Sequence, residues 1–92
     1  MFNTSTVRDR ISMFSNAPAL RAPSFDLVNK VQGERPEVQI LALATALTAL
    51  SEAIGMNPHD IITIISKAKG HIDGPFSTQY KALQAYAQGE FN

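Results

Sequence analysis

Apolar residues recur along the chain at spacings of three and four, which is the period of an amphipathic α-helix. Glycine and proline separate the segments with this pattern, because these residues stop a helix or cannot continue one. The pattern predicts an all-α fold, a small bundle of four to five helices with a long central helix, in a single domain over residues 1–92. The predicted helices cover residues 6–15, 24–32, 36–54, 58–69 and 77–88.

The first two helices are placed by residues that cap helix ends. Thr6 is expected to cap the first helix and Ser24 the second, since a side-chain oxygen there accepts a hydrogen bond from a free backbone N–H. Pro18 and Pro23 lie between these helices, and the residue before a proline disfavours helical geometry. Residues 17–24 are therefore predicted to form a linker.

The longest helix begins with Pro36 in its first turn and ends before Gly55, which supplies a left-handed stop. Its apolar residues cover more than the single stripe of a surface helix, so we expect it to be buried on most sides. The short flanking helices offer little surface to cover it, which favours a homo-oligomer or a protein partner, unless these helices and the linker cover everything. The expected interface residues are Leu43, Leu47, Leu50, Ile62, Ile64 and Tyr86.

The next helix has the clearest start in the chain, with Asn57 as cap and Pro58 as first residue. It contains a run of β-branched residues, 61–65, that out of context is typical of a buried strand. The start signal, and the stop at Gly70, favour a helix. The alternative is that two chains pair these segments as strands across a dimer.

The last helix is expected to start at Ser77 or Thr78 as cap. Tyr80 and Tyr86 lie on it at helical spacing. Tyrosines of this kind pack in a core or anchor an interface, and both roles stay open.

Charge and composition limit the classes of partner. Lysine plus arginine and aspartate plus glutamate number eight each, so nothing draws the chain towards nucleic acid or anionic lipid. The absence of cysteine excludes disulfides and thiolate metal sites and favours a reducing compartment. The N-terminus lacks the apolar stretch of a signal peptide, and the apolar run 40–50 is shorter than the roughly 20 residues of a spanning helix. We expect a cytoplasmic protein that contacts neither membrane nor nucleic acid.

No constellation of residues points to catalysis. His59 and His71 lie at opposite ends of one predicted helix, so they cannot share a metal ion within one chain. The acidic residues fall at helix starts, exposed faces and turns rather than in pairs suited to general acid and base work. No nucleophile motif, phosphate loop or dinucleotide fingerprint occurs. We expect no enzyme activity, no metal and no cofactor.

Basic residues suggest a second hypothesis, a sponge that sequesters a phosphorylated small ligand or signalling nucleotide at a subunit interface. The densest basic group is Lys67, Lys69 and His71, although cations in a last helical turn also stabilise the helix itself. The residues expected in such a site are Arg8, Arg10, Lys67, Lys69, His71 and Tyr80. A third hypothesis is a helix-turn-helix DNA-binding protein with its turn at 55–57. The helix that would enter the major groove is poorly suited to recognise bases, because its isoleucines leave few polar side chains to hydrogen-bond with base edges.

Two segments, PEVQILALATALTALSEAIGMNPHD at 36–60 and YKALQAYAQGEFN at 80–92, resemble small helical accessory proteins encoded by bacteriophages. The resemblance covers about half of the chain and depends on an apolar helix followed by a Gly-x-Asn-Pro junction. It implies an early phage product in the host cytoplasm that neutralises a host enzyme or sequesters a signalling nucleotide. With the residue patterns, it leads us to expect a non-enzymatic, oligomeric helical module that binds and blocks or adapts a host protein.

Overall fold

Four of the five prolines stand at the first residue of a helix in the computed structural model, which describes residues 3–70 and 74–91. The first turn of a helix leaves its backbone N–H groups unpaired, so the missing N–H of proline costs nothing there. The prediction of an all-α helical bundle is confirmed. The helices are α1 (Thr4–Ser12), α2 (Pro18–Val31), α3 (Pro36–Ala53), α4 (Pro58–Lys69) and α5 (Pro75–Phe91).

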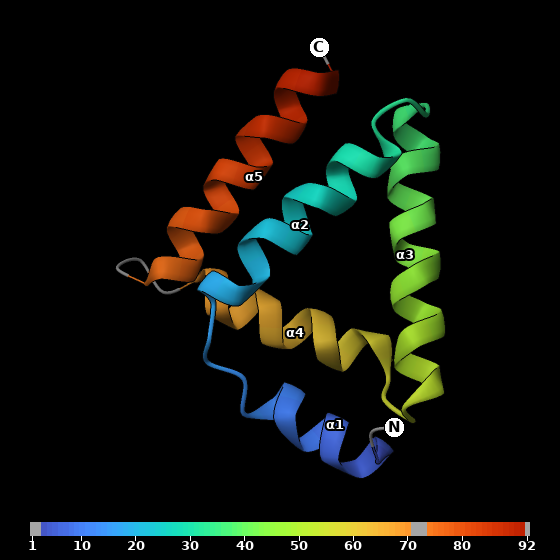
Figure 1. The fold of residues 1–92 in the computed structure, drawn as a ribbon, viewed down its shortest axis with the longest axis vertical. Coiled ribbons are helices and arrows are strands. Elements are labelled where there is room, and N and C mark those ends of the chain that lie inside the picture. Colours follow the sequence, from blue (N-terminus) through green and yellow to red (C-terminus); the bar gives the residue numbers. More distant parts are fainter. Residues whose placement is uncertain (1–2, 71–73, 92) are drawn as a thin grey trace.

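Helix α4 crosses the middle of the molecule, with α1 on one side of it, α2 and α5 on the other, and α3 upright at its N-terminal end (Figure 1). Contacts join α2 to α5 and to α3, and α4 to α3 and to α5. The molecule measures 41 × 31 × 22 Å. Its shortest dimension equals about two helix diameters of 10–12 Å, so most helices have a side that no other helix covers.

The junction between α3 and α4 forms as the sequence predicts. Gly55 has φ +75°, and the N–H groups of Gly55 and Met56 donate to the carbonyls of Glu52 and Ser51 at 3.1 and 2.9 Å. This double bond pattern is a Schellman motif, which pairs carbonyls that the helix end leaves free. At the start of α4, Oδ1 of Asn57 accepts from the backbone N–H of His59 at 2.8 Å. The predicted bounds of α3 and α4 agree with the structure to within one residue.

Residues 61–65 lie within α4, so the helical interpretation of this isoleucine-rich run is confirmed. Pairing of the run as a strand across a dimer is contradicted for this conformation of the chain. The strong start signal at Asn57 and Pro58 outweighs the β-propensity of the segment.

The prediction of a linker over 17–24 is wrong. Helix α2 starts at Pro18 and continues through Pro23 to Val31, so Ser24 is an interior residue and not a cap. An interior proline removes one backbone hydrogen bond of the helix, and the residue before it disfavours helical geometry without excluding it. Within this helical segment, Leu20 is half-buried and lines a pocket between α1 and α4.

The bounds of the first and last helices also differ from the prediction. Asn3, not Thr6, caps α1: its Oδ1 accepts from the N–H of Ser5 at 2.9 Å, and the helix ends at Ser12 rather than residue 15. Helix α5 starts at Pro75, so neither Ser77 nor Thr78 caps it. It also continues past the predicted end at residue 88 to Phe91.

The expected burial of α3 is wrong as well. Its buried residues are Gln39 and Ser51, 7% and 1% exposed, and both are polar and lie towards its ends. Among the side chains that the structure describes, no hydrophobic one is buried. The helices therefore meet at partly exposed contacts, and the apolar surface of α3 stays open to solvent over its middle.

Candidate binding surfaces

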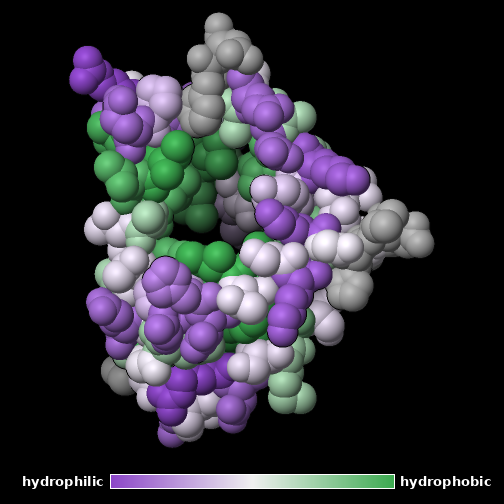
Figure 2. All heavy atoms as spheres, turned by 180° about the vertical axis from the view of Figure 1, so that it is seen from behind, coloured by the Kyte–Doolittle hydropathy of each residue, from purple (hydrophilic) through white to green (hydrophobic). Residues whose placement is uncertain are grey.

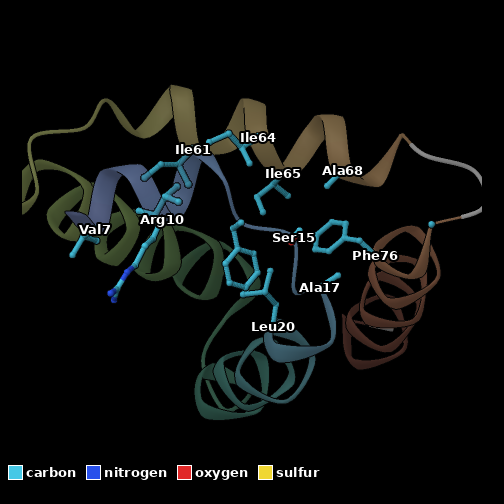
Figure 3. Close-up of a pocket in the computed structure, with 13 residues that line it drawn as sticks. Val7, Arg10, Ser15, Ala17, Leu20, Ile61, Ile64, Ile65, Ala68 and Phe76 are labelled. Atoms are coloured by element: carbon cyan, nitrogen blue, oxygen red, sulfur yellow. The ribbon is translucent and has the colours of Figure 1, made fainter. Parts of the chain in front are cut away.

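An apolar pocket of about 600 Å³ lies between α1, α4 and the start of α2 (Figure 3). The side chains that face each other across it come from α1 and α4 at spacings of three and four, so each helix presents one apolar face. Pocket volumes of about 300–1,000 Å³ are typical of small-molecule sites. The main lining residues are Val7 and Ile11 on α1, Phe14 just after it, and Ile61, Ile64 and Ile65 on α4.

The two ends of this pocket differ in polarity. Arg10 lies beside Val7 at one end, with its guanidinium directed away from the isoleucines (Figure 3). Phe76, from the first turn of α5, lies at the other end. Ser15 is the other polar side chain in the lining. The pocket is thus an open, mostly apolar groove, with Arg10 at one end and its guanidinium turned away from the apolar walls.

A second apolar surface is α3 itself. Figure 2 shows a hollow on the opposite face of the molecule, with apolar atoms around it and on the side where α3 stands. Thr45 and Thr48 donate their hydroxyl groups to the carbonyls of Leu41 and Ala44, four residues earlier, at 2.7 and 2.8 Å. These hydroxyls are paired within the helix, so the two threonines add little free polarity to the surface. The large exposed side chains of α3 are Val38, Ile40, Leu41 and Leu50, which are 42, 58, 65 and 70% exposed.

The structure does not bring the six predicted interface residues onto one face. Leu43 and Leu47 are half-buried on α3, beside the exposed Leu50. Ile62 is 47% exposed on α4, whereas Ile64 lines the pocket. These residues belong to at least two surfaces of the chain.

Tyr86 takes part in packing within the chain. Its ring lies 5.6 Å from that of Phe25, centroid to centroid, and its hydroxyl donates to Oδ1 of Asn29. Both partners lie on α2, so Tyr86 joins α5 to α2. Of the two roles left open for this residue, the structure shows packing within the chain.

The predicted basic cluster is divided among separate places. Nη1 of Arg8 donates to the backbone carbonyl of Ile54 at 2.6 Å, where the C-terminal end of α3 carries partial negative charge. Nζ of Lys69 lies 4.9 Å from the ring centre of Tyr80, a cation–π contact. Arg8 and Lys69 thus have structural partners.

The other basic residues of the hypothesis lie elsewhere. Arg10 stands at the end of the pocket, and Lys67 is exposed on α4 outside the pocket lining. His71 lies outside the described residues. Within one chain, the cations that the structure describes do not converge on one site.

Sequence reasoning missed the Arg8 contact with Ile54 and the contribution of Phe76 to the pocket. The walls of the pocket had a signal, since the apolar spacing on residues 7–14 and 61–68 was visible. The pairing of these two walls had none, because periodicity gives the apolar face of a helix and not its neighbour.

The angle between α3 and α4 is 113°, within the range of roughly 90–120° of helix-turn-helix units. Ile62 is 47% exposed on the second of these helices, where a DNA reader needs polar side chains. The helix-turn-helix interpretation stays a hypothesis.

No single helix of the described residues is long and apolar enough to cross a membrane, and α3 and α4 meet the length and hydropathy requirement together only as a bent pair. Residues 3–70 and 74–91 contain no group of three or more histidine, aspartate or glutamate side chains placed to hold a metal ion.

Comparison with known proteins adds no relative. No protein-family model, curated protein or solved structure matches the chain. The class that the fold defines is therefore a small all-α bundle with an apolar pocket and an exposed apolar helix.

Proposed function

We propose that this chain is a non-enzymatic binding module that assembles with further copies of itself through α3 and binds and blocks or adapts a protein partner. One observation carries the proposal: α3 is exposed to solvent although it has no charged residue from position 38 to position 51. A helix without a polar face is stable when other surfaces cover it, in a large core, in a membrane or in an interface.

The length of the uncharged stretch fits an interface. Residues 38–51 span about 21 Å at a rise of about 1.5 Å per residue. Within the chain, α2 and α4 contact α3, and the two buried residues lie near its ends. The exposed middle of α3 is therefore long enough to receive a helix from another chain over several turns.

A second copy of the chain has suitable chemistry to cover part of this stretch. Arg35 precedes the first residue of α3 and Glu52 lies in its last turn, and both are exposed. Two α3 helices packed antiparallel would place Arg35 of one copy near Glu52 of the partner subunit at both ends of the interface. Ala42, Ala46 and Ala49 lie between these ends, and small side chains allow close approach of helix backbones.

A two-helix contact covers one side of α3 and leaves another side open. The exposed apolar groups of α3 point in several directions, since Ile40, Leu41 and Leu50 are separated by roughly 100° per residue around the axis. The side that self-association leaves uncovered supplies the surface for a protein partner.

The test is native mass spectrometry and light scattering of the full chain and of the double variant Leu41→Lys with Leu50→Lys. These side chains are 65 and 70% exposed, so the substitutions leave the contacts within the chain in place. Leu41 and Leu50 lie on opposite sides of α3, about 180° apart around its axis, so a contact on either side loses one of these leucines from each chain. Losing burial of one leucine removes about 1.5–3 kcal/mol per chain from association, and we expect the dissociation constant of a dimer to rise by at least about 100-fold.

The matched control is Met13→Lys, which places a lysine on another exposed apolar side chain, 81% exposed, at the end of α1. It should keep the oligomer, and circular dichroism should show the same helicity for all variants. A wild-type chain that is monomeric at every concentration would overturn the assembly step. An oligomer that survives the double variant would move the interface away from α3.

A further inference from the structure

We propose that α1 is a strap that closes on α4. In a second state of the chain, the apolar face of α1 packs directly against the isoleucines of α4 and fills the pocket between the two helices. The structure shows the open state of this strap. No residue of α3 lines the pocket, so the inference goes beyond the proposed assembly and does not depend on it.

Helix α1 is weakly attached to the rest of the fold. The main contacts between helices of residues 3–70 and 74–91 join α2, α3, α4 and α5, and α1 takes part in none of them. Arg8 donates to the carbonyl of Ile54 at 2.6 Å, and Arg10 also interacts within the chain. Arginine side chains and the connection to α2 therefore hold α1 in place, rather than a packed interface between helices.

The connection between α1 and α2 allows α1 to change direction. Residues 14–16 lie in no helix, and Ser15 and Asn16 are exposed. The hinges of moving elements are a few loop or helix-end residues that absorb changes in φ and ψ. Helix α1 has nine residues, so it can move as one body about this connection while its own backbone hydrogen bonds stay in place.

The two walls of the pocket have matching apolar faces. Val7 and Ile11 lie four residues apart on α1, and Ile61 and Ile65 lie four residues apart on α4 (Figure 3). These four side chains are half-buried, and about 600 Å³ of open space lies between the walls. Removing apolar surface from water is favourable, and packed helices have axes about 8–10 Å apart. Movement of α1 to this distance from α4 would remove the open space.

The hydrogen bond of Arg8 opposes this movement. Arg8 follows Val7 in the sequence, and consecutive side chains point about 100° apart around a helix. Its guanidinium therefore reaches the end of α3 from the side of α1, and Arg8 is not part of the pocket lining. Closure would stretch the bond to Ile54, whereas burial of the apolar walls favours closure. The two states are in equilibrium when these contributions are close in magnitude.

The experiment measures the distance between two spin labels, on α1 and α4, by pulsed electron spin resonance. The sequence has no cysteine, so the double variant Asp9→Cys with Thr63→Cys carries labels at these two places only. Both residues are exposed and lie outside the pocket lining. We expect two distance populations, one that matches the structure and one that is shorter. The control pair Thr48→Cys with Thr63→Cys labels α3 and α4, which contact each other, and should give one population.

Two substitutions should change the populations in opposite directions. Phe14→Asp should reduce the shorter population by at least about tenfold, because closure would bury the new carboxylate. The matched control is Met13→Asp, at a side chain that is 81% exposed and outside the pocket lining, and it should change neither population. Arg8→Gln removes the charged donor to Ile54 and should raise the shorter population by at least about threefold.

A single distance population that matches the structure would overturn the proposal. A shorter population that Phe14→Asp does not reduce, or that Arg8→Gln does not raise, would also contradict it. A shorter population that disappears on dilution with unlabelled chain would assign the contact to a second copy instead. The double variant Leu41→Lys with Leu50→Lys should keep both populations, so failure of the assembly and failure of the strap are distinguishable.

Discussion

The substitution Gly55→Ala tests the turn that joins α3 to α4. Gly55 has φ +75°, a conformation in which a Cβ atom collides with the backbone. It also lies beside Arg8, because a Cβ built on Gly55 comes within 3.2 Å of the Arg8 Nη1 atom. That same nitrogen donates to the carbonyl of Ile54. The substitution therefore acts on the turn and on its link to α1.

The expected loss of stability follows from three contributions. Holding alanine in the left-handed region costs about 1–2 kcal/mol. Alanine has less backbone conformational entropy than glycine in the unfolded chain, which stabilises the folded state by about 0.4–1 kcal/mol and offsets part of this cost. Displacing Arg8 weakens its part-buried hydrogen bond to the carbonyl of Ile54. Solvent screens this charged donor, so we expect the weakened bond to cost about 1 kcal/mol. The free energy of unfolding should therefore fall by about 1–2 kcal/mol.

Urea unfolding followed by circular dichroism measures this loss. The controls are Gly33→Ala and Gly89→Ala, where an added Cβ has no atom within 4 Å and φ is not positive. Gly89 lies within α5, so its replacement should stabilise the chain by about 0.5–1 kcal/mol. If Gly55→Ala has the same effect as these controls, the left-handed turn does not exist in solution and the α3–α4 junction is wrong.

Two further substitutions test helix starts and interiors by the same unfolding measurement. Asn57→Ala removes the acceptor of the His59 N–H and should cost about 1 kcal/mol; no change would mean that water replaces the cap fully. Pro23→Ala restores a backbone N–H inside α2 and should stabilise the chain by about 1–2 kcal/mol. An interior proline costs the folded helix about 3 kcal/mol, but it also restricts the unfolded chain, which offsets part of this cost. A loss of stability would show that residues 18–23 are not helical.

The sequence determines α3 and α4 almost completely, because their ends are marked by local chemistry. Pro36, Gly55, Asn57 and Pro58 act within a few residues of their own position, and the structure shows each in the role that its residue type favours. Capping and left-handed stops need no information from distant parts of the chain. The same reasoning identified the isoleucine-rich segment as a helix.

The start of α2 could not be predicted because its cause is distant. Proline at position 23 favours a break on local grounds. In the structure the helix continues through this proline, and Leu20 lines the same pocket as Ile61 and Ile64 of α4, about 40 positions further along the chain. Helix α5 likewise continues through Gly89 to Phe91, although glycine near a helix end is typical of a stop.

The candidate sites show the same division between local and distant information. The sequence shows both walls of the pocket as apolar faces, but their position on opposite sides of one pocket depends on how residues 13–17 direct α1 relative to α4. Arg8 had a plausible role in anion binding, and in the structure it pairs with the carbonyl of Ile54, 46 residues away. The local sequence predicts where α3 ends, but it does not predict that Arg8 lies beside that end, because the position of Arg8 depends on how α1 packs in the fold.

The exposure of α3 follows from the thickness of the molecule. A molecule 22 Å thick has room for about two helix layers, and in two layers each helix packs on one side only. Amphipathic helices satisfy this arrangement, whereas α3 has no charged side over residues 38–51. The residues that the structure describes form no third layer over the middle of α3. The proposed assembly would supply this layer from another chain, and the residue that tests the proposal most directly is Leu50, the most exposed large side chain of α3.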